Sequence, residues 1–173
     1  PLWLIHGVWV NDYIQNSHRD AYDKDFFDAF LEDCKTVVDV LHGNKKISLG
    51  RMASAGSGTY NKDISPWVLG YILGVEWEDV TVVFTDEKYK NNSKYNSYSG
   101  KYMYTAEDAS PFEALLAKLG DKVIEYESEK YKMQKLVAFS NWPTTDPFYY
   151  PEQVTKIFMK CAQVDVENIK TTD

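Results

Sequence analysis

Apolar residues along the chain gather in two kinds of segment. Short runs at residues 2–10, 68–75 and 136–139 are rich in β-branched and aromatic side chains, which favours buried strands over helices. A further brief strand is predicted at residues 46–49. Residues 25–41, by contrast, carry apolar side chains at spacings of three and four and end at a glycine, which predicts an amphipathic helix.

A second helix is predicted to begin at Ser110. Its hydroxyl suits the N-cap, Pro111 suits the first helical position, and Glu113 completes a capping box. Ser65 and Pro66 can open a helical turn before the strand at 68–75. Polar segments predicted as loops are residues 53–59, 86–104 and 140–151, and a last helix is predicted near residues 153–159.

Strands that alternate with helices predict an α/β fold with βαβ units and a largely parallel sheet. The length of 173 residues suits a single domain, residues 1–173. In parallel sheets and barrels, ligands bind beyond the carboxyl ends of the strands. We therefore expect functional side chains at His6, Glu76, Asn141 and Trp142, and we predict Trp77, beside Glu76, as a further substrate-binding residue.

Residues 65–77 read SPWVLGYILGVEW. This segment resembles the fourth-strand region of retaining glycoside hydrolases of the cellulase and mannanase type, which fold as (β/α)8 TIM barrels. On that resemblance residues 2–10 correspond to strand two, 46–49 to strand three and 136–139 to strand five. The resemblance implies a fragment of a larger barrel, a carbohydrate ligand, and an extracellular or cell-envelope location.

The resemblance also implies a role for Glu76, which matches the general acid/base at the end of the fourth strand. Val75 stands where the family has an asparagine. Retaining hydrolysis needs two carboxyl groups about 5 Å apart, one to protonate the leaving oxygen and one to attack the anomeric carbon. The family's nucleophile lies on strand seven, beyond the strands matched here, so we expect no glycosidase activity from the isolated chain.

Each candidate residue has a structural interpretation beside the functional one. The apolar run before Glu76, with Val75 and Trp77 beside it, suits a general acid, whereas a strand-end carboxylate can also pair with Lys or Arg. The segment after the strand at 136–139 also has two interpretations. It mixes stacking and hydrogen-bonding groups, as sugar subsites do, at Asn141, Trp142, Thr144, Thr145 and Asp146. Alternatively, the same segment forms a rigid proline-containing turn. His6 either faces a cleft or is a hydrogen-bonded structural histidine.

The composition narrows the function classes. A formal charge of −7 and the absence of a basic stripe argue against nucleic acid. No apolar run approaches the roughly 20 residues that a membrane span needs, so no membrane contact is expected. Cys34 and Cys161 are far apart and form no paired ligand spacing, and no metal or cofactor is indicated. Cys34 lies on the apolar helix face, which favours a buried, inert thiol.

The 13 tyrosines and 5 tryptophans suit both cores and sugar sites. Several tyrosines fall in the polar segment 86–104, where they form either a stacking platform for glycans or a solvated insertion. Two other functions therefore stay open: a non-catalytic carbohydrate-binding domain, and a protein-interaction domain. Uncovered strand edges would favour self-association or contact with the remainder of a parent chain.

Overall fold

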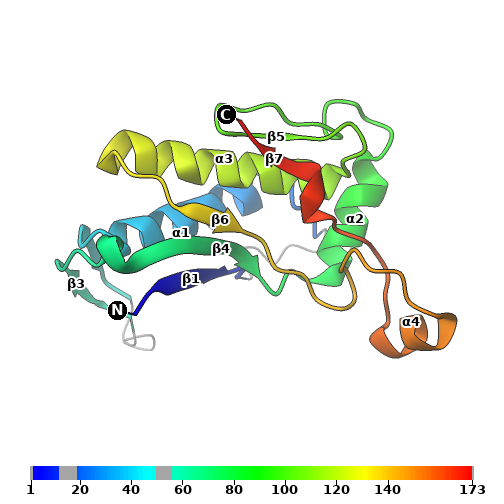
Figure 1. Ribbon diagram of the computed structural model, residues 1–173, viewed down its shortest axis with the longest axis horizontal. Coiled ribbons are helices and arrows are strands. Elements are labelled where there is room, and N and C mark those ends of the chain that lie inside the picture. Colours follow the sequence, from blue (N-terminus) through cyan, green and yellow to red (C-terminus); the bar gives the residue numbers. More distant parts are fainter. Residues whose placement is uncertain (1, 12–18, 50–55, 173) are drawn as a thin grey trace.

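The computed structural model describes residues 2–11, 19–49 and 56–172. Figure 1 shows the arrangement of the helices and strands. In chain order they are β1 (Leu4–Trp9), α1 (Lys24–Leu41), β2 (Lys45–Ile47), β3 (Gly58–Tyr60), a 3-10 turn (Ser65–Trp67), β4 (Val68–Val75), α2 (Asp79–Tyr89), β5 (Met103–Thr105), α3 (Pro111–Tyr131), β6 (Leu136–Ala138), α4 (Glu152–Phe158), a second 3-10 turn (Val166–Asn168) and β7 (Ile169–Thr171).

A parallel sheet of three strands in the order β1-β4-β6 forms the centre of the molecule. Its register pairs Ile5 with Gly70, and Gly70 with Leu136. The prediction of an α/β fold with βαβ units is confirmed, because helix α1 connects β1 to β4, and α2 and α3 connect β4 to β6. The strand at 68–75 lies where the sequence predicts it, and it is the central strand.

One face of the sheet packs against α1 and α3 (Figure 1). The core between these layers is formed by residues from both helices and from β4, including Phe30, Val38, Tyr71, Leu73, Leu115 and Leu119. Burial of each such side chain contributes about 1.5–3 kcal/mol to folding. Cys34 is buried in the same core, as its position on the apolar face of α1 predicts.

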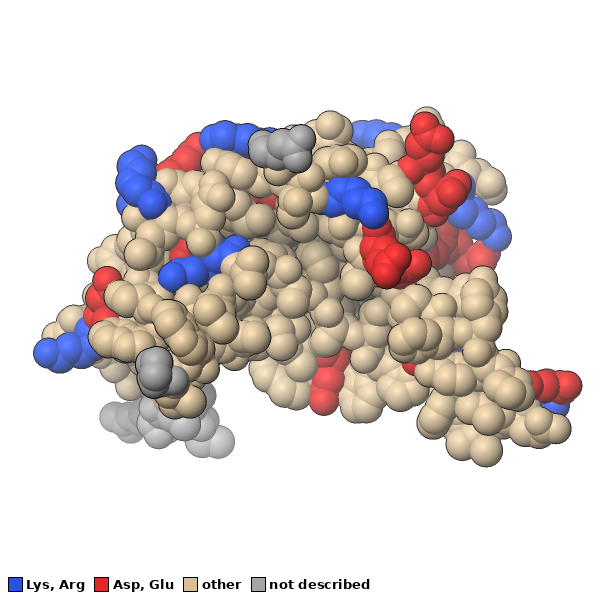
Figure 2. All heavy atoms as spheres, viewed as in Figure 1, with Lys and Arg blue, Asp and Glu red and all other residues tan. Residues whose placement is uncertain are grey.

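The opposite face of the sheet is apolar, and its side chains on the edge strands β1 and β6 are exposed. Tyr71 and Leu73 point to the helices, so Gly70 belongs to the other face, together with Ile5 and Leu136, which pair with it. Ile5 is 60% exposed and Leu136 is 73% exposed. In the view of Figures 1 and 2 the strands pass in front of α1, and uncharged residues cover the centre while charged residues lie mostly at the rim.

The ends of the long helices follow local capping signals. Asp23 caps α1 by accepting hydrogen bonds from the backbone N–H groups of Asp25 and Phe26. At α3 both halves of the predicted capping box are present, since Ser110 Oγ accepts from Glu113 N–H and the Glu113 carboxylate accepts from Ser110 N–H. Such caps each stabilise a helix by about 1 kcal/mol.

Two strand predictions are corrected. The strand predicted at 46–49 is β2, which forms an antiparallel hairpin with β3 and lies outside the parallel sheet. β1 and β4 are therefore direct neighbours, and the assignment of residues 46–49 to a barrel strand between them is wrong. The segment 136–139 does form a parallel strand, but its edge position leaves Leu136 exposed rather than buried.

The polar segments contain more regular structure than predicted. Gly58 and Thr59, expected in a loop, belong to β3, while residues 53–55 of that segment lie outside the described residues. Helix α2 extends to Tyr89, into the predicted loop 86–104. The predicted helix at 153–159 is present as α4. None of the helices in the described ranges is long and apolar enough to cross a membrane.

Candidate functional site

A pocket of about 430 Å³ lies at the carboxyl ends of the parallel strands. It is lined by Arg19, Glu76, Trp77, Glu78, Asp79, Trp142 and Thr144. These residues come from the segments that follow β1, β4 and β6, because parallel strands bring their carboxyl ends to one edge of the sheet. The pocket therefore brings together four of the residues that the sequence singled out: Glu76, Trp77, Trp142 and Thr144.

The turn after β4 sets the direction of Glu76. Gly74 has a φ of 78° and Glu76 a φ of 58°, so the chain leaves the extended conformation within three residues. A left-handed backbone is uncommon for a residue with a side chain, and such positions often occur at functional sites. As a result the Glu76 side chain is exposed at the pocket, rather than enclosed by the apolar residues beside it in the sequence.

Trp77 belongs mainly to the core. It is 2% exposed, and its indole makes edge contacts with the rings of Phe30 and Phe112, with centroids 5.3 and 5.0 Å away. A Cβ on Gly74 would lie 1.9 Å from Trp77 Nε1, so only glycine leaves room for the indole. Trp77 thus forms the floor of the pocket, and its burial does not fit the stacking platform implied by its predicted role in substrate binding.

The loop after β6 presents Trp142 to the pocket, where 44% of the residue is exposed. Two neighbours hold this loop in place instead of lining the pocket. Asn141 Nδ2 donates to the carbonyl of Val164 at 2.9 Å. Asp146 accepts from Lys160 Nζ at 2.7 Å and from the hydroxyl of Tyr150 at 2.6 Å.

These contacts change the interpretation of Asn141 and Asp146. Burial raises the pKa of Asp146, but the hydrogen bonds from Lys160 and Tyr150 outweigh it and lower the pKa below its ordinary value. A carboxylate satisfied in this way anchors the loop. Asn141 and Asp146, both predicted to bind ligand, therefore hold the loop that carries Trp142 and do not line the pocket.

His6 does not reach the pocket. It pairs in register with Tyr71, whose hydroxyl bonds to Glu127 of α3, so His6 lies on the helix-facing side of β1. Its side chain is exposed because β1 is an edge strand. His6 is therefore not among the residues that line this pocket. His18 lies outside the described residues.

Three charged residues of the pocket were not predicted from the sequence. Glu78 and Asp79 directly follow the predicted strand end, so the strand-end rule could have included them. Arg19 could not be found this way, because only the folded chain brings it to Glu78, with a nitrogen to oxygen distance of 3.1 Å. With three carboxylates and one guanidinium, the pocket offers acceptors that suit hydroxyl-rich ligands better than anions.

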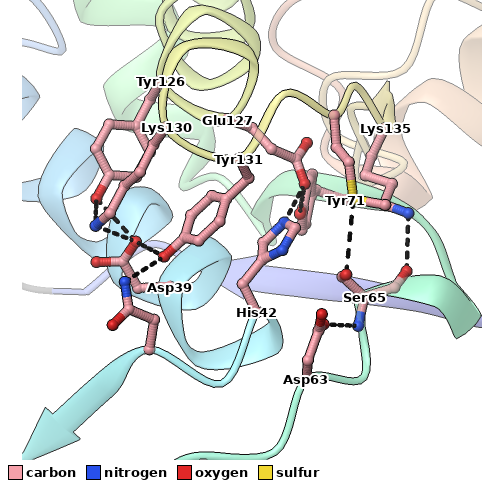
Figure 3. Close-up of polar contacts among 12 residues, drawn as sticks. Asp39, His42, Asp63, Ser65, Tyr71, Tyr126, Glu127, Lys130, Tyr131 and Lys135 are labelled. Carbon is pink, nitrogen blue, oxygen red and sulfur yellow. Dashed lines mark hydrogen bonds and ion pairs between the residues drawn. The ribbon is translucent and has the colours of Figure 1, made fainter.

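A buried polar cluster occupies the opposite end of the sheet (Figure 3). Glu127 Oε1 accepts the hydroxyl of Tyr71 and Nε2–H of His42, each at 2.8 Å. The side chains of His42 and Glu127 are 4% and 1% exposed. The His42 ring also stacks on Tyr131, with centroids 3.8 Å apart.

A second carboxylate extends this cluster. Asp39 Oδ1 accepts from the hydroxyls of Tyr126 and Tyr131 and from Lys130 Nζ, at 2.7–2.8 Å. These bonds join the end of α1 to the end of α3 (Figure 3). Because its two carboxylates are buried and hydrogen-bonded, the cluster fits a structural role at the amino end of the sheet.

The described residues include two free cysteines, Cys34, which is buried, and Cys161, which is exposed. No group of three or more His, Cys, Asp or Glu side chains is arranged to hold an ion among the described residues. Burial raises the pKa of the Cys34 thiol, which makes it a poor nucleophile. Comparisons with models of known protein families, with curated proteins and with solved structures give no significant match to this chain.

Proposed function

We propose that this chain is part of a glycoside hydrolase-like domain that acts on carbohydrate, with its sugar site in the pocket at the carboxyl end of the sheet. The observation that carries the proposal is the meeting of Glu76 and Trp142 in one pocket. One supplies a carboxyl group and the other an exposed aromatic face, and sugar sites combine these two groups.

Glu76 is the proposed general acid/base. It is exposed at the end of the central strand, and in the described ranges it forms no ion pair with a lysine or arginine. The other two carboxylates of the pocket are already engaged: Glu78 pairs with Arg19, and Asp79 Oδ1 accepts the N–H of Val80 at 2.7 Å. Glu76 is thus the carboxylate best able to reach a glycosidic oxygen.

The sheet itself supports the barrel part of the proposal. The strands of the parallel sheet, β1, β4 and β6, are adjacent in the same order in which they occur along the chain, as neighbouring strands of a (β/α)8 barrel are. Their uncovered face is apolar, as at Ile5 and Leu136, and parallel sheets bury both faces. We infer that further βα units of the same barrel cover this face and pair with the edges of β1 and β6.

Glycan binding tests the site directly. Cello- and manno-oligosaccharides are titrated calorimetrically into the chain, into Trp142→Ala and into Trp67→Ala. Trp67 is a matched control because it is 50% exposed but precedes β4, at the opposite end of the sheet. We expect Trp142→Ala to weaken binding about tenfold, since an aromatic contact contributes up to about 1.5 kcal/mol. Absence of binding, or equal loss in both variants, would contradict the proposal.

Catalysis is tested separately. The chain alone is not expected to release chromophore from an aryl glycoside, because retaining hydrolysis needs a second carboxyl about 5 Å from the first. Turnover that Glu76→Gln abolishes and Glu107→Gln preserves would refute this expectation. Glu107 is a suitable control because it too is exposed. Binding without turnover in the complete parent barrel would assign it to non-catalytic carbohydrate recognition.

A further inference from the structure

A second pocket, of about 530 Å³, lies on the helical side of the molecule between α1, α3 and the segment 94–98. Its lining consists of charged, aromatic and aliphatic side chains: Tyr22, Lys24, Phe27, Asp28, Leu31, Lys94, Tyr95, Tyr98, Lys118 and Lys122. It shares no lining residue with the pocket around Glu76. Any ligand held here is therefore additional to the proposed sugar substrate.

Four ammonium groups gather at this pocket in a protein whose formal charge is −7. Lys24 pairs with Asp28, and Lys122 pairs with Glu125 at 2.7 Å. Lys94 and Lys118 form no ion pair with any carboxylate in the described ranges. The pocket thus holds more positive charge than its own acidic residues neutralise.

Lys118 is the most constrained of these cations. Its ammonium lies 4.6 Å from the centre of the buried Phe27 ring, and the residue is half-buried on α3. Burial lowers the pKa of Lys118, and the charges of Lys122, Lys94 and Lys24 lower it further, although Asp28 opposes them. An ammonium held near others of the same sign is stabilised when an anion binds among them.

The aromatic walls are fixed before any ligand binds. The hydroxyl of Tyr22 donates to the carbonyl of Pro111 at 3.0 Å, and its ring meets Tyr95 edge-on, with centroids 4.7 Å apart. The hydroxyl of Tyr98 donates to Asp121 at 2.9 Å. Held rings offer contact area without the entropy cost of ordering side chains on binding.

We propose that this pocket binds a small ligand in which an oxyanion, a phosphate, sulfate or carboxylate, is attached to a ring. The oxyanion lies among Lys94, Lys118 and Lys122, and the ring rests on Tyr95, Tyr98 and the aliphatic wall. Lysine binds phosphate and carboxylate as a point charge, and aromatic faces bind the apolar faces of rings.

The test uses three probes of similar size: glucose 6-phosphate, glucuronate and neutral glucose. Each is titrated calorimetrically at low and at high salt into the chain and into Lys118→Met, Lys94→Met and Lys170→Met. Methionine keeps an apolar stem over Phe27 while removing the charge. Lys170 is a matched control, since it is an exposed lysine on β7, away from the pocket.

We expect at least one anionic probe to bind more tightly than glucose, and its binding to weaken with salt. Lys118→Met and Lys94→Met should each weaken binding about tenfold, and Lys170→Met should leave it unchanged. Preference between the two anionic probes distinguishes a phosphorylated from a carboxylated ligand. Failure of both anions to bind, or equal weakening by all three variants, would overturn the proposal. Lys94 lies on an exposed loop, so its variant keeps the test valid if Lys118→Met misfolds.

Discussion

Replacing Glu127 with alanine should cost more stability than any change at the pocket around Glu76. The carboxylate is 1% exposed, and one oxygen accepts hydrogen bonds from Tyr71 and His42 (Figure 3). Glu127→Ala leaves two buried donors without their acceptor. Each buried donor left unsatisfied costs about 1–3 kcal/mol, so the two together should cost about 2–6 kcal/mol, a large part of the about 5–15 kcal/mol that stabilises a domain.

Urea denaturation followed by circular dichroism measures this cost. Glu129→Ala is the matched control, because Glu129 lies two residues away and its side chain is 66% exposed. The control should change the free energy of unfolding by less than about 0.5 kcal/mol. Tyr71→Phe removes one of the two donors and should cost about 1.5–3 kcal/mol, the contribution of a hydrogen bond to a charged group. A loss below about 1 kcal/mol in Glu127→Ala would refute the structural role of the cluster.

Two further changes test the turn after β4 and the pH dependence of folding. Gly74→Ala should destabilise the protein by more than about 2 kcal/mol, because a Cβ would overlap the Trp77 indole and because the residue has a φ of 78°. Gly58→Ala is the control, since its Cβ would meet its nearest neighbour at 3.9 Å and should leave stability nearly unchanged. Thermal unfolding measures both variants. Burial raises the pKa of Asp86 from 3.8 to about 6, although the N–H of Phe112 opposes this, so the folded state binds more protons and stability falls as pH rises from 4 to 6. Asp86→Asn should remove up to about 3 kcal/mol of this loss, so the variant should be more stable than the parent protein at pH 7 but not at pH 4. Urea titrations at both pH values measure the free energies of unfolding. The same difference between variant and parent at pH 4 and pH 7 would contradict this prediction.

The elements that the sequence predicted well carry their signals locally. The strand β4 is a continuous apolar run, and α3 begins with a complete capping box at Ser110. The sequence did not predict helix α2, because Thr81 and Thr85 lie with Val82 on its buried side. Threonine does not count as apolar when a helix is predicted from the spacing of apolar residues. The partner of β2 is also not a local property, so its pairing with β3 could not be predicted.

The residues of the candidate site could be predicted only in part, because some of them depend on non-local structure. Strand ends can be located in a sequence, and this rule found Glu76 and Trp142. The direction of a side chain after the strand end depends on the turn, and the left-handed backbone at Gly74 and Glu76 places Trp77 in the core. Arg19 reaches the pocket only through the tertiary fold.

The difference between exposed pocket residues and residues that stabilise the fold determines which substitutions report on function. Glu76 and Trp142 are exposed and lie outside the buried cluster around Glu127, so changing them should leave the free energy of unfolding nearly unaltered. Trp77 fills the core, and Asp146 anchors its loop through Lys160, so loss of ligand binding on changing either would mix folding with recognition. A change in glycan affinity without a change in unfolding, at Glu76 or Trp142, is therefore the measurement that connects this pocket to carbohydrate.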